Sequence, residues 1–296
     1  MKRRTALLSG LALVLPVRGA SADSTINLYG SPVEVSIEGE ASSALRALIP
    51  RWITQSAQAV HAYYGKFPVP QGRIIVVVQE GAGCKGGQTM PDDVPYIRIR
   101  VGANSTESQL LKQDWVLVHE MIHLAFPWMN GAHNWMAEGL AVYVESIARV
   151  QAGHLKPAQI WPDFIGSMPK GLPGEGDYGI DVTQTWGRTY WGGALFSLIA
   201  DVTIRQETGN AKGLQHALRA INAERDFRRN WPFRETLEVG DAATGRHVLA
   251  SLYDSWKETP VSPDLPKLWA DLGVQPVNPD APLAAIPQAI QAPMAG

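Results

Sequence analysis

Hydrophobic and polar positions follow a short period in the N-terminal part of the chain. Residues 25–37 are predicted to form a hairpin, residues 73–78 (RIIVVV) a buried strand, and residues 94–101 (VPYIRIRV) a half-solvated or edge strand. Residues 41–63 carry apolar residues at helical spacing, with Pro50 expected to kink or break the helix. A glycine-rich loop is expected between the last two strands.

The remainder of the chain has helical periodicity. Thr106 and Gln109 fit a capping box that starts the helix containing residues 115–126. Further helices are predicted at residues 135–151, 189–208, 211–222 and 245–257. Residues 155–188 are rich in Gly, Pro and Asp and are predicted to form a long loop. Strands followed by helices predict the α+β class.

Composition and the N-terminus suggest a folded, exported protein. The 296 residues are 45% apolar and 18% charged, which is enough for a sizeable core. Residues 1–22 combine a basic start, a short apolar run and Ala20-Ser21-Ala22, which predicts a cleaved secretory signal; a retained amphipathic anchor is the alternative. The location expected is periplasmic or secreted, by general or twin-arginine export, without a stable membrane anchor after cleavage.

Charge and cysteine content exclude some classes. The signal contains four basic and no acidic residues, so its removal would change the net charge from −2 to −6. An acidic chain without basic clusters argues against binding to nucleic acid or anionic membranes. Cys84 is the one cysteine, so no intrachain disulfide forms, and it is interpreted as incidental and not reactive.

The apolar run at residues 115–126 (WVLVHEMIHLAF) contains three groups that are costly to bury, His119, Glu120 and His123. Four positions apart on a helix, the histidines lie on one face, about 5–6 Å apart at Cβ, which suits two imidazole ligands of one zinc ion. Glu120 lies beside them, where a carboxylate can take a proton from activated water. The alternative is two core histidines that bond to backbone or water.

A catalytic zinc ion needs a third protein ligand and an open position. His133 and Glu138 are the candidates, and Glu138 lies near the start of the otherwise apolar helix at residues 135–151. Glu145, two turns further on, is expected either to hydrogen-bond a ligand histidine or to be a surface residue at the helix end. The residues alone do not decide whether His133 or Glu138 is the third ligand.

Several segments resemble a known family. HEMIH followed by WMAEGLAVYVE is similar to the glutamate-zincin signature of the aminopeptidase N clan. TYWGGALFSLIADVTIRQETGN and LYDSWKETPVSPDLPKLWADLGV are most similar to its glycyl-aminopeptidase branch, and the resemblance covers about residues 75–274. It implies one Zn²⁺ ion held by His119, His123 and Glu138. It also implies that Tyr190 hydrogen-bonds the transition-state oxyanion.

The resemblance further implies a fold and a division of the chain. The fold is a thermolysin-like (zincin-like) α+β domain, with a small N-terminal mixed sheet, a mainly helical lobe and an active-site cleft between them. The parts are a signal peptide (1–22), a truncated N-terminal β/α segment (23–72), a gluzincin catalytic domain (73–274) and a flexible tail rich in Pro and Ala (275–296).

The chain departs from the family on the strand before the zinc helix. The family's aminopeptidases have a glutamate there that holds the free α-amino group of the substrate, whereas residues 86–90 (GGQTM) contain none. Gly192 stands where the family's tyrosine motif has a lysine. Aminopeptidase and endopeptidase activity therefore both remain open.

These observations predict a zinc metallopeptidase that acts on a peptide or protein, with Glu120 as general base and Tyr190 as oxyanion stabiliser. The alternative is a zinc-retaining, inactive protein on the same fold that binds peptides or assists assembly. Residues 94–101 are expected to bind the substrate backbone as an added strand. The loop at residues 171–188, with Trp186 and Arg188, is expected to wall the cleft. Arg188 is expected to be a surface residue, and binding of a carboxylate is the alternative.

Overall fold

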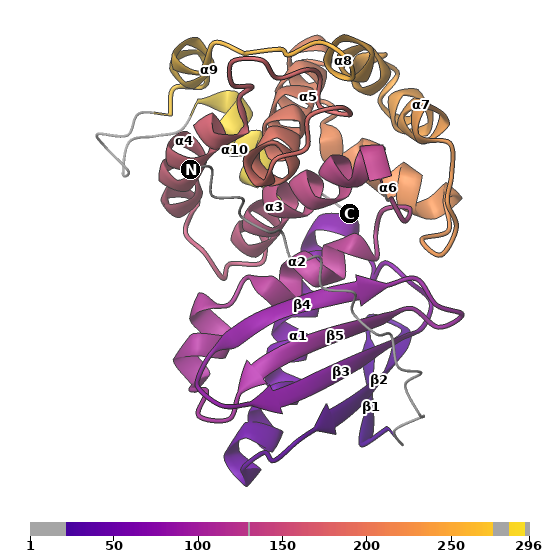
Figure 1. Cartoon of the computed structure of the whole chain (residues 1–296), viewed down its shortest axis with the longest axis vertical. Coiled ribbons are helices and arrows are strands. Elements are labelled where there is room, and N and C mark those ends of the chain that lie inside the picture. The colour runs from indigo at the N-terminus through magenta and orange to yellow at the C-terminus, as the bar shows by residue number, and fades with distance from the viewer. Residues whose placement is uncertain (1–21, 130, 275–283, 294–296) are drawn as a thin grey trace, which may run out of the picture.

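The computed structural model describes residues 22–129, 131–274 and 284–293. A five-stranded sheet forms one side of the molecule and most of the helices gather on the other (Figure 1). This is the predicted α+β arrangement, a small N-terminal mixed sheet followed by a helical lobe. The predicted signal peptide, apart from Ala22, lies outside the described residues.

The sheet contains both parallel and antiparallel pairs in the order β1-β2-β3-β5-β4. Its strands are β1 Ser24–Leu28, β2 Ser31–Glu38, β3 Gly72–Gln79, β4 Cys84–Met90 and β5 Tyr96–Gly102. β1 and β2 form the predicted antiparallel hairpin. β3 lies parallel to β2 and to β5, and β4 pairs antiparallel with β5.

The edge strand beside the helical lobe is β4. Of the two alternatives predicted for residues 94–101, the edge strand is therefore wrong and the half-solvated strand is confirmed. β5 lies between β3 and β4, and its alternation arises because Ile97 and Ile99 are fully buried while Arg98 and Arg100 are on the outer face. β4 occupies the stretch expected to be a glycine-rich loop. Backbone pairing needs no side chains, so the neighbouring strand holds this glycine-rich segment extended.

Helix α1, Ser43–Tyr64, lies against the sheet (Figure 1). It runs unbroken through Pro50 and ends at Gly65, whose φ of 76° is left-handed. The predicted break at Pro50 is therefore wrong. Proline removes one backbone hydrogen bond, but Ile49 and Ile53 on either side are fully buried, and their burial offsets that loss.

Helix α2 begins later than predicted. The capping box of Thr106 and Gln109 forms, with reciprocal backbone-to-side-chain distances of 2.9 and 3.3 Å, but it opens a separate π-helical segment, Ser108–Gln113. Asp114 has an extended backbone and separates this segment from α2. Its carboxylate accepts hydrogen bonds from the first two backbone N–H groups of α2, Val116–His123, at 3.1 and 3.2 Å.

The rest of the helical lobe follows in sequence order. Its helices are α3 Asn134–Gln151, α4 Ile160–Ser167, α5 Gly193–Glu207, α6 Leu214–Glu224, α7 Phe233–Thr244, α8 Val248–Trp256, α9 Leu265–Leu272 and α10 Ala285–Gln291. Helices α3, α5, α6 and α8 match predicted helices with shifted ends. Residues 155–188 do not form one long loop, because α4 and short 3₁₀ turns occupy the first half of that stretch.

The tail predicted to be flexible contains α10, so that prediction is wrong for residues 285–291. Ile290 is fully buried, and Gln151 of α3 donates hydrogen bonds to the backbone oxygens of Ile290 and Ala292 at 3.1 and 3.2 Å. These partners are 139 and 141 positions apart in sequence, so composition alone does not indicate them.

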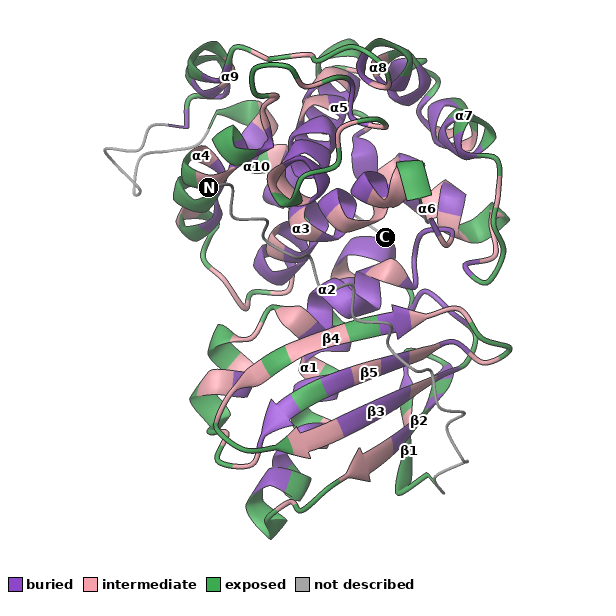
Figure 2. Ribbon diagram, in the orientation of Figure 1, coloured by how far each residue is buried: buried purple, intermediate pink, exposed green. Residues whose placement is uncertain are grey.

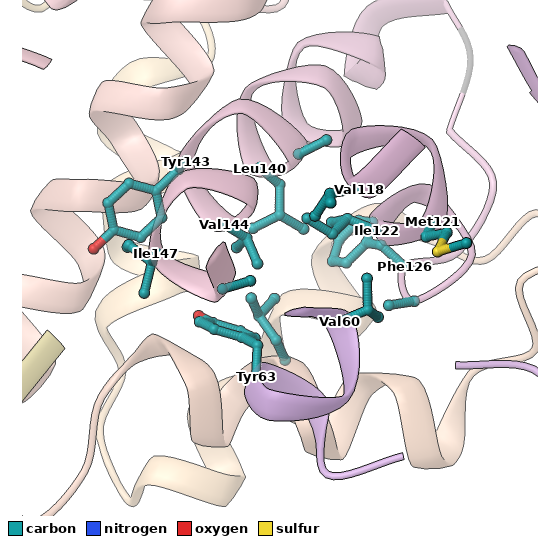
Figure 3. Packing of buried hydrophobic residues seen from close by; sticks show 14 of the residues in the cluster. Val60, Tyr63, Val118, Met121, Ile122, Phe126, Leu140, Tyr143, Val144 and Ile147 are labelled. Carbon is teal, nitrogen blue, oxygen red and sulfur yellow. The ribbon is translucent and has the colours of Figure 1, made fainter. Parts of the chain in front are cut away.

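Helices α1, α2 and α3 share one core, which fixes the helix that carries the histidine pair. Figure 3 shows the buried side chains that gather there, among them Val60, Tyr63, Val118, Ile122, Leu140 and Val144. In Figure 2 the ribbons of α2 and α3 are buried along most of their length. Among the described residues, none of the helices has the length and apolarity needed to span a bilayer.

Candidate metal centre and active site

Three side chains with metal-binding atoms meet between α2 and α3. His119 and His123 come from successive turns of α2, and Glu138 comes from the second turn of α3. The Nε2 atoms of the two histidines are 3.2 Å apart, and Oε2 of Glu138 is 3.2 and 3.6 Å from them. All three ligand atoms lie within 4.8 Å of one another.

The surroundings of the cluster favour a neutral His119 and an ionised Glu138, which are protonation states that metal ligation requires. Burial lowers the pKa of His119, which keeps this imidazole neutral. Burial alone would raise the pKa of Glu138, but hydrogen bonds to His119 and His123 outweigh burial and hold that pKa well below its usual value. Burial would lower the pKa of His123, but the hydrogen bond to Glu138 and the charges of Glu138 and Glu120 outweigh burial and raise that pKa. Neutral imidazoles and an ionised carboxylate are the forms that bind metal.

The donor set fits a zinc ion. Nδ1 of His119 is buried without a hydrogen-bond partner among the described residues. The hydrogen-bond contacts of this ring are therefore those that Nε2 makes within the cluster. Two imidazole nitrogens, one carboxylate oxygen and an open side toward a cleft match the ligands of a catalytic zinc site.

Two glycines let α3 and α5 cross closely beside the cluster. A Cβ on Gly139 would lie 2.2 Å from Cα of Gly193, and a Cβ on Gly193 would lie 2.1 Å from a backbone oxygen of α3. Neither helix can therefore carry a side chain at the crossing. This close approach brings Tyr190, which lies in the π-helical segment Arg188–Gly192 before α5, into the cleft that contains Glu138.

Glu120 is on the side of α2 that contacts β4, and its side chain is buried. The hydroxyl of Thr89 lies 2.7 Å from Oε2 of Glu120 and 2.8 Å from its backbone oxygen. A Cβ on Gly87 would lie 2.7 Å from Cγ of Glu120. Strand β4 therefore fixes the position of this carboxylate in two ways. The hydroxyl of Thr89 hydrogen-bonds to it, and the absence of a side chain at Gly87 leaves room for it.

Tyr190 lines the same cleft as Glu120 and Glu138. Burial, and then the negative charges of these two carboxylates, raise the pKa of the Tyr190 phenol. The hydroxyl therefore stays protonated at neutral pH and can donate a hydrogen bond. The ring of Trp186 lies beside it, with the centroids 5.7 Å apart, and Trp186 itself is 62% exposed.

His133, the other candidate third ligand, is not part of the cluster. Its Nε2 lies 3.1 Å from the hydroxyl of Tyr253 and 3.6 Å from Oδ2 of Asp181, and its ring stacks on Phe233. Asp181 lies in the loop after α4 and Tyr253 lies in α8, so His133 links the start of α3 to both. The structure thus brings Glu138, and not His133, to the histidine pair.

The structure also corrects two lesser predictions. Glu145 is neither bonded to a ligand histidine nor on the surface: it is buried, and it contacts Ser146 and Nη1 of Arg149, 3.2 Å away. Arg188 is 4% exposed and donates a hydrogen bond to the backbone oxygen of Tyr178 at 3.1 Å. It is therefore no surface residue, and it does not line the cleft.

The cluster opens into a cleft of about 600 Å³. Its wall includes residues that the sequence did not single out, among them Gln88 and Thr89 of β4, Arg98 and Arg100 of β5, and Phe227. The sequence predicted a half-solvated or edge strand at β5, and the structure places both arginines on its outer face. The pairing of β5 with β4 was needed to show that this outer face continues into the cleft.

Neither a protein-family model nor a curated protein matches the sequence. Solved structures do match it. An aminopeptidase N family protein from Idiomarina loihiensis has a TM-score of 0.61 and 11% identity, over 84% of this chain and 49% of its own. An M1 zinc metallopeptidase from Deinococcus radiodurans has a TM-score of 0.53 and 16% identity, over 83% of this chain and 53% of its own. A mutant two-domain M1 zinc metallopeptidase bound to L-arginine has a TM-score of 0.52 and 14% identity, with the same coverage of 83% and 53%.

These similarities establish the fold. The chain has the fold of the M1 zinc metallopeptidase structures that it matches, and it spans about half of their length. The zincin-like α+β fold implied by the sequence resemblance is confirmed. The function must be argued from the site itself, because one fold can support many activities.

Proposed function

We propose that the protein is a zinc-dependent peptidase. The observation that carries this proposal is the meeting of His119, His123 and Glu138 within 4.8 Å, in a cleft that Glu120 and Tyr190 also line. A zinc ion held by these three ligands would supply Lewis-acid activation of water. The shared fold of M1 zinc metallopeptidases supports this choice of metal and reaction class.

Two protein groups would carry the proton transfer and the charge. Glu120 takes a proton from the attacking water and later passes it to the leaving amine. The hydroxyl of Thr89 donates to Oε2 of Glu120, which leaves Oε1 for this proton. Tyr190 donates a hydrogen bond to the developing oxyanion, and loss of one such donor costs about 2.7–4 kcal/mol in other enzymes.

The substrate backbone would bind along β4. This strand is the last in the sheet, so one row of its backbone groups has no strand partner among the described residues. An extended peptide can add to such an edge as a further strand. The binding strand is therefore β4, and not residues 94–101 as expected from the sequence.

We also propose that the substrate is a peptide or protein outside the cytoplasm. This rests on the first 22 residues, which have the basic start, apolar run and small-residue site of a secretory signal. The acidic charge of the remaining chain gives no reason to expect a nucleic-acid partner.

The test compares the wild type with Glu120→Gln and a matched control, Glu235→Gln. Glu235 is an exposed residue in the first turn of α7. Each protein is incubated with a diverse peptide pool, the cuts are read by mass spectrometry, and zinc is measured on the same samples. We expect one zinc per chain in all three proteins, and cuts by the wild type and the control alone.

Each other outcome has a definite meaning. Cuts by Glu120→Gln at the wild-type rate would show that Glu120 is not the base. Zinc in all three proteins with no cut by any of them would favour the inactive, peptide-binding alternative. The positions of the cuts distinguish removal of terminal residues from cleavage within a chain.

A further inference from the structure

Two arginines face the cleft from the far side of the edge strand. Arg98 and Arg100 are on the outer face of β5, and both line the cleft that contains the histidine cluster. In the pairing of β4 with β5, Gly86 lies opposite Arg100 and Gln88 lies opposite Arg98. A peptide added to the free edge of β4 would therefore be separated from these arginines by one strand.

The glycine at position 86 lets one of these arginines lie over that strand. A Cβ on Gly86 would lie 2.9 Å from Nη2 of Arg100, closer than real Cβ contacts come. Gly86 also has a φ of 113°, which favours glycine. The guanidinium of Arg100 thus passes over a position without a side chain, toward the edge where the peptide would bind.

The two arginines differ in how their charge is balanced. The two terminal nitrogens of Arg98, Nη2 and Nη1, donate hydrogen bonds to the carboxylate of Glu38 at 2.6 and 3.3 Å. Arg100 donates one hydrogen bond at 3.3 Å to the backbone oxygen of Lys85, and no carboxylate of the described residues pairs with it. Arg100 therefore brings an unbalanced positive charge to this side of the cleft.

Neither carboxylate that lines the cleft is paired with Arg100. The carboxylates that line it are Glu120, which the hydroxyl of Thr89 contacts, and Glu138, which the two histidines contact. Strand β4 itself, CKGGQTM, has no acidic residue. No acidic side chain of β4 therefore lies between Arg100 and a peptide at the free edge.

We propose, building on the proposed peptidase function, that Arg100 binds a carboxylate of the substrate and so selects acidic peptides. Side chains on one face of neighbouring strands are in contact, and strands lie about 4.7–4.9 Å apart. A substrate residue opposite Gly86 would point its side chain to the face over which Arg100 extends. Arginine is suited to this role because its planar fork binds carboxylates through two hydrogen bonds.

The carboxylate can belong to an Asp or Glu side chain or to the C-terminus of the peptide. Binding is measured in the Glu120→Gln background, so that turnover does not interfere. The probes are octapeptides, acetylated at the N-terminus, that differ only in Glu or Gln at one scanned position. Each is made with a free and an amidated C-terminus, and Kd is measured by calorimetry.

We expect the acidic member of the best pair to bind about tenfold more tightly than its neutral partner at low salt, and this preference to shrink as salt is added. Adding Arg100→Gln should abolish the preference, whereas Arg100→Lys should keep part of it. The matched control is Arg46→Gln, an exposed arginine of α1 outside the cleft, which should change nothing. Melting temperatures check that each variant is folded.

The inference is overturned if acidic and neutral peptides bind equally, if neither binds, or if the preference survives Arg100→Gln. A preference that follows the scanned Glu identifies a side chain, and one that follows the free C-terminus identifies the terminal carboxylate. Cleavage by the wild type without an acidic preference would remove this subsite and leave the peptidase proposal standing. Acid-selective binding without any cleavage would keep the subsite at Arg100 and remove the peptidase proposal.

Discussion

The space at Gly87 gives a sharp test of how Glu120 is held. The substitution Gly87→Ala adds one methyl group to β4. Gly87 does not have a left-handed φ, so the backbone accepts alanine without strain. The new Cβ would lie 2.7 Å from Cγ of Glu120 and 3.0 Å from its Cδ and Oε1. All three of these atoms belong to the side chain of Glu120, so this side chain must move to make room for the methyl group.

The size of this movement sets the expected loss. Carbon atoms in contact prefer a separation of about 3.5–4.0 Å, so the Glu120 side chain must shift by about 1 Å. Such a shift disturbs the hydrogen bond from Thr89, which is 2.7 Å long. A misplacement of about 1 Å in a reacting group can lower a rate about 100-fold, so we expect kcat to fall by that order. Zinc binding should persist, because no ligand is touched.

The assay is steady-state hydrolysis of a peptide found in the pool, with zinc content and melting temperature measured beside it. The matched control is Gly166→Ala in α4, where no atom lies within 4 Å of the added Cβ. The control should keep full activity and gain up to about 1 kcal/mol of stability from its better helix propensity. Full activity of zinc-loaded Gly87→Ala would refute the reasoning. Loss of zinc or of folding would show that Gly87 serves the fold and not the base.

Further predictions concern the oxyanion donor, the metal and the thiol. Tyr190→Phe should lower kcat about 10²- to 10³-fold with zinc content unchanged, and unaltered steady-state kinetics would exclude the donor role. Glu138→Ala should lose zinc on dialysis, as measured by metal analysis, and full zinc content would remove Glu138 from the ligand set. Burial, and then the charge of Asp114, raise the pKa of Cys84 to about 12, so at pH 8 iodoacetamide should label it slowly until the protein is unfolded. Equally rapid labelling of the folded protein, seen by mass spectrometry, would contradict this.

The histidine pair of the candidate metal centre could be predicted because its chemistry stands out locally. His119 and His123 are costly to bury in an apolar helix, and a metal ion offers a common partner for both. Glu138 could be chosen over His133 only through the family resemblance, since both lie close in sequence. The structure explains the outcome: Asp181 and Tyr253, far along the chain, hold His133 elsewhere.

The cleft beyond β4 could not be predicted, because it depends on pairing between strands. Glycines in residues 84–90 indicate a loop by propensity, and the hydrogen bonds that make this stretch a strand come from β5. The arginines of β5 alternate with buried residues, as on any solvent-facing strand. Only the register that places Gly86 opposite Arg100 gives that arginine a path into the cleft.

This register also bears on which end of a peptide the site can accept. The aminopeptidases that the sequence resembles hold the substrate's ammonium group with a glutamate on this strand, and here the guanidinium of Arg100 lies over Gly86 of the strand instead. Two like charges about 4 Å apart repel by about 1 kcal/mol in water and about 4 kcal/mol near a protein surface. A free N-terminus beside Arg100 would therefore bind several-fold to several-hundredfold more weakly than an uncharged segment. The same charge attracts a carboxylate, so we expect the cleft to favour acidic segments within a chain, or a C-terminus, over an N-terminal residue.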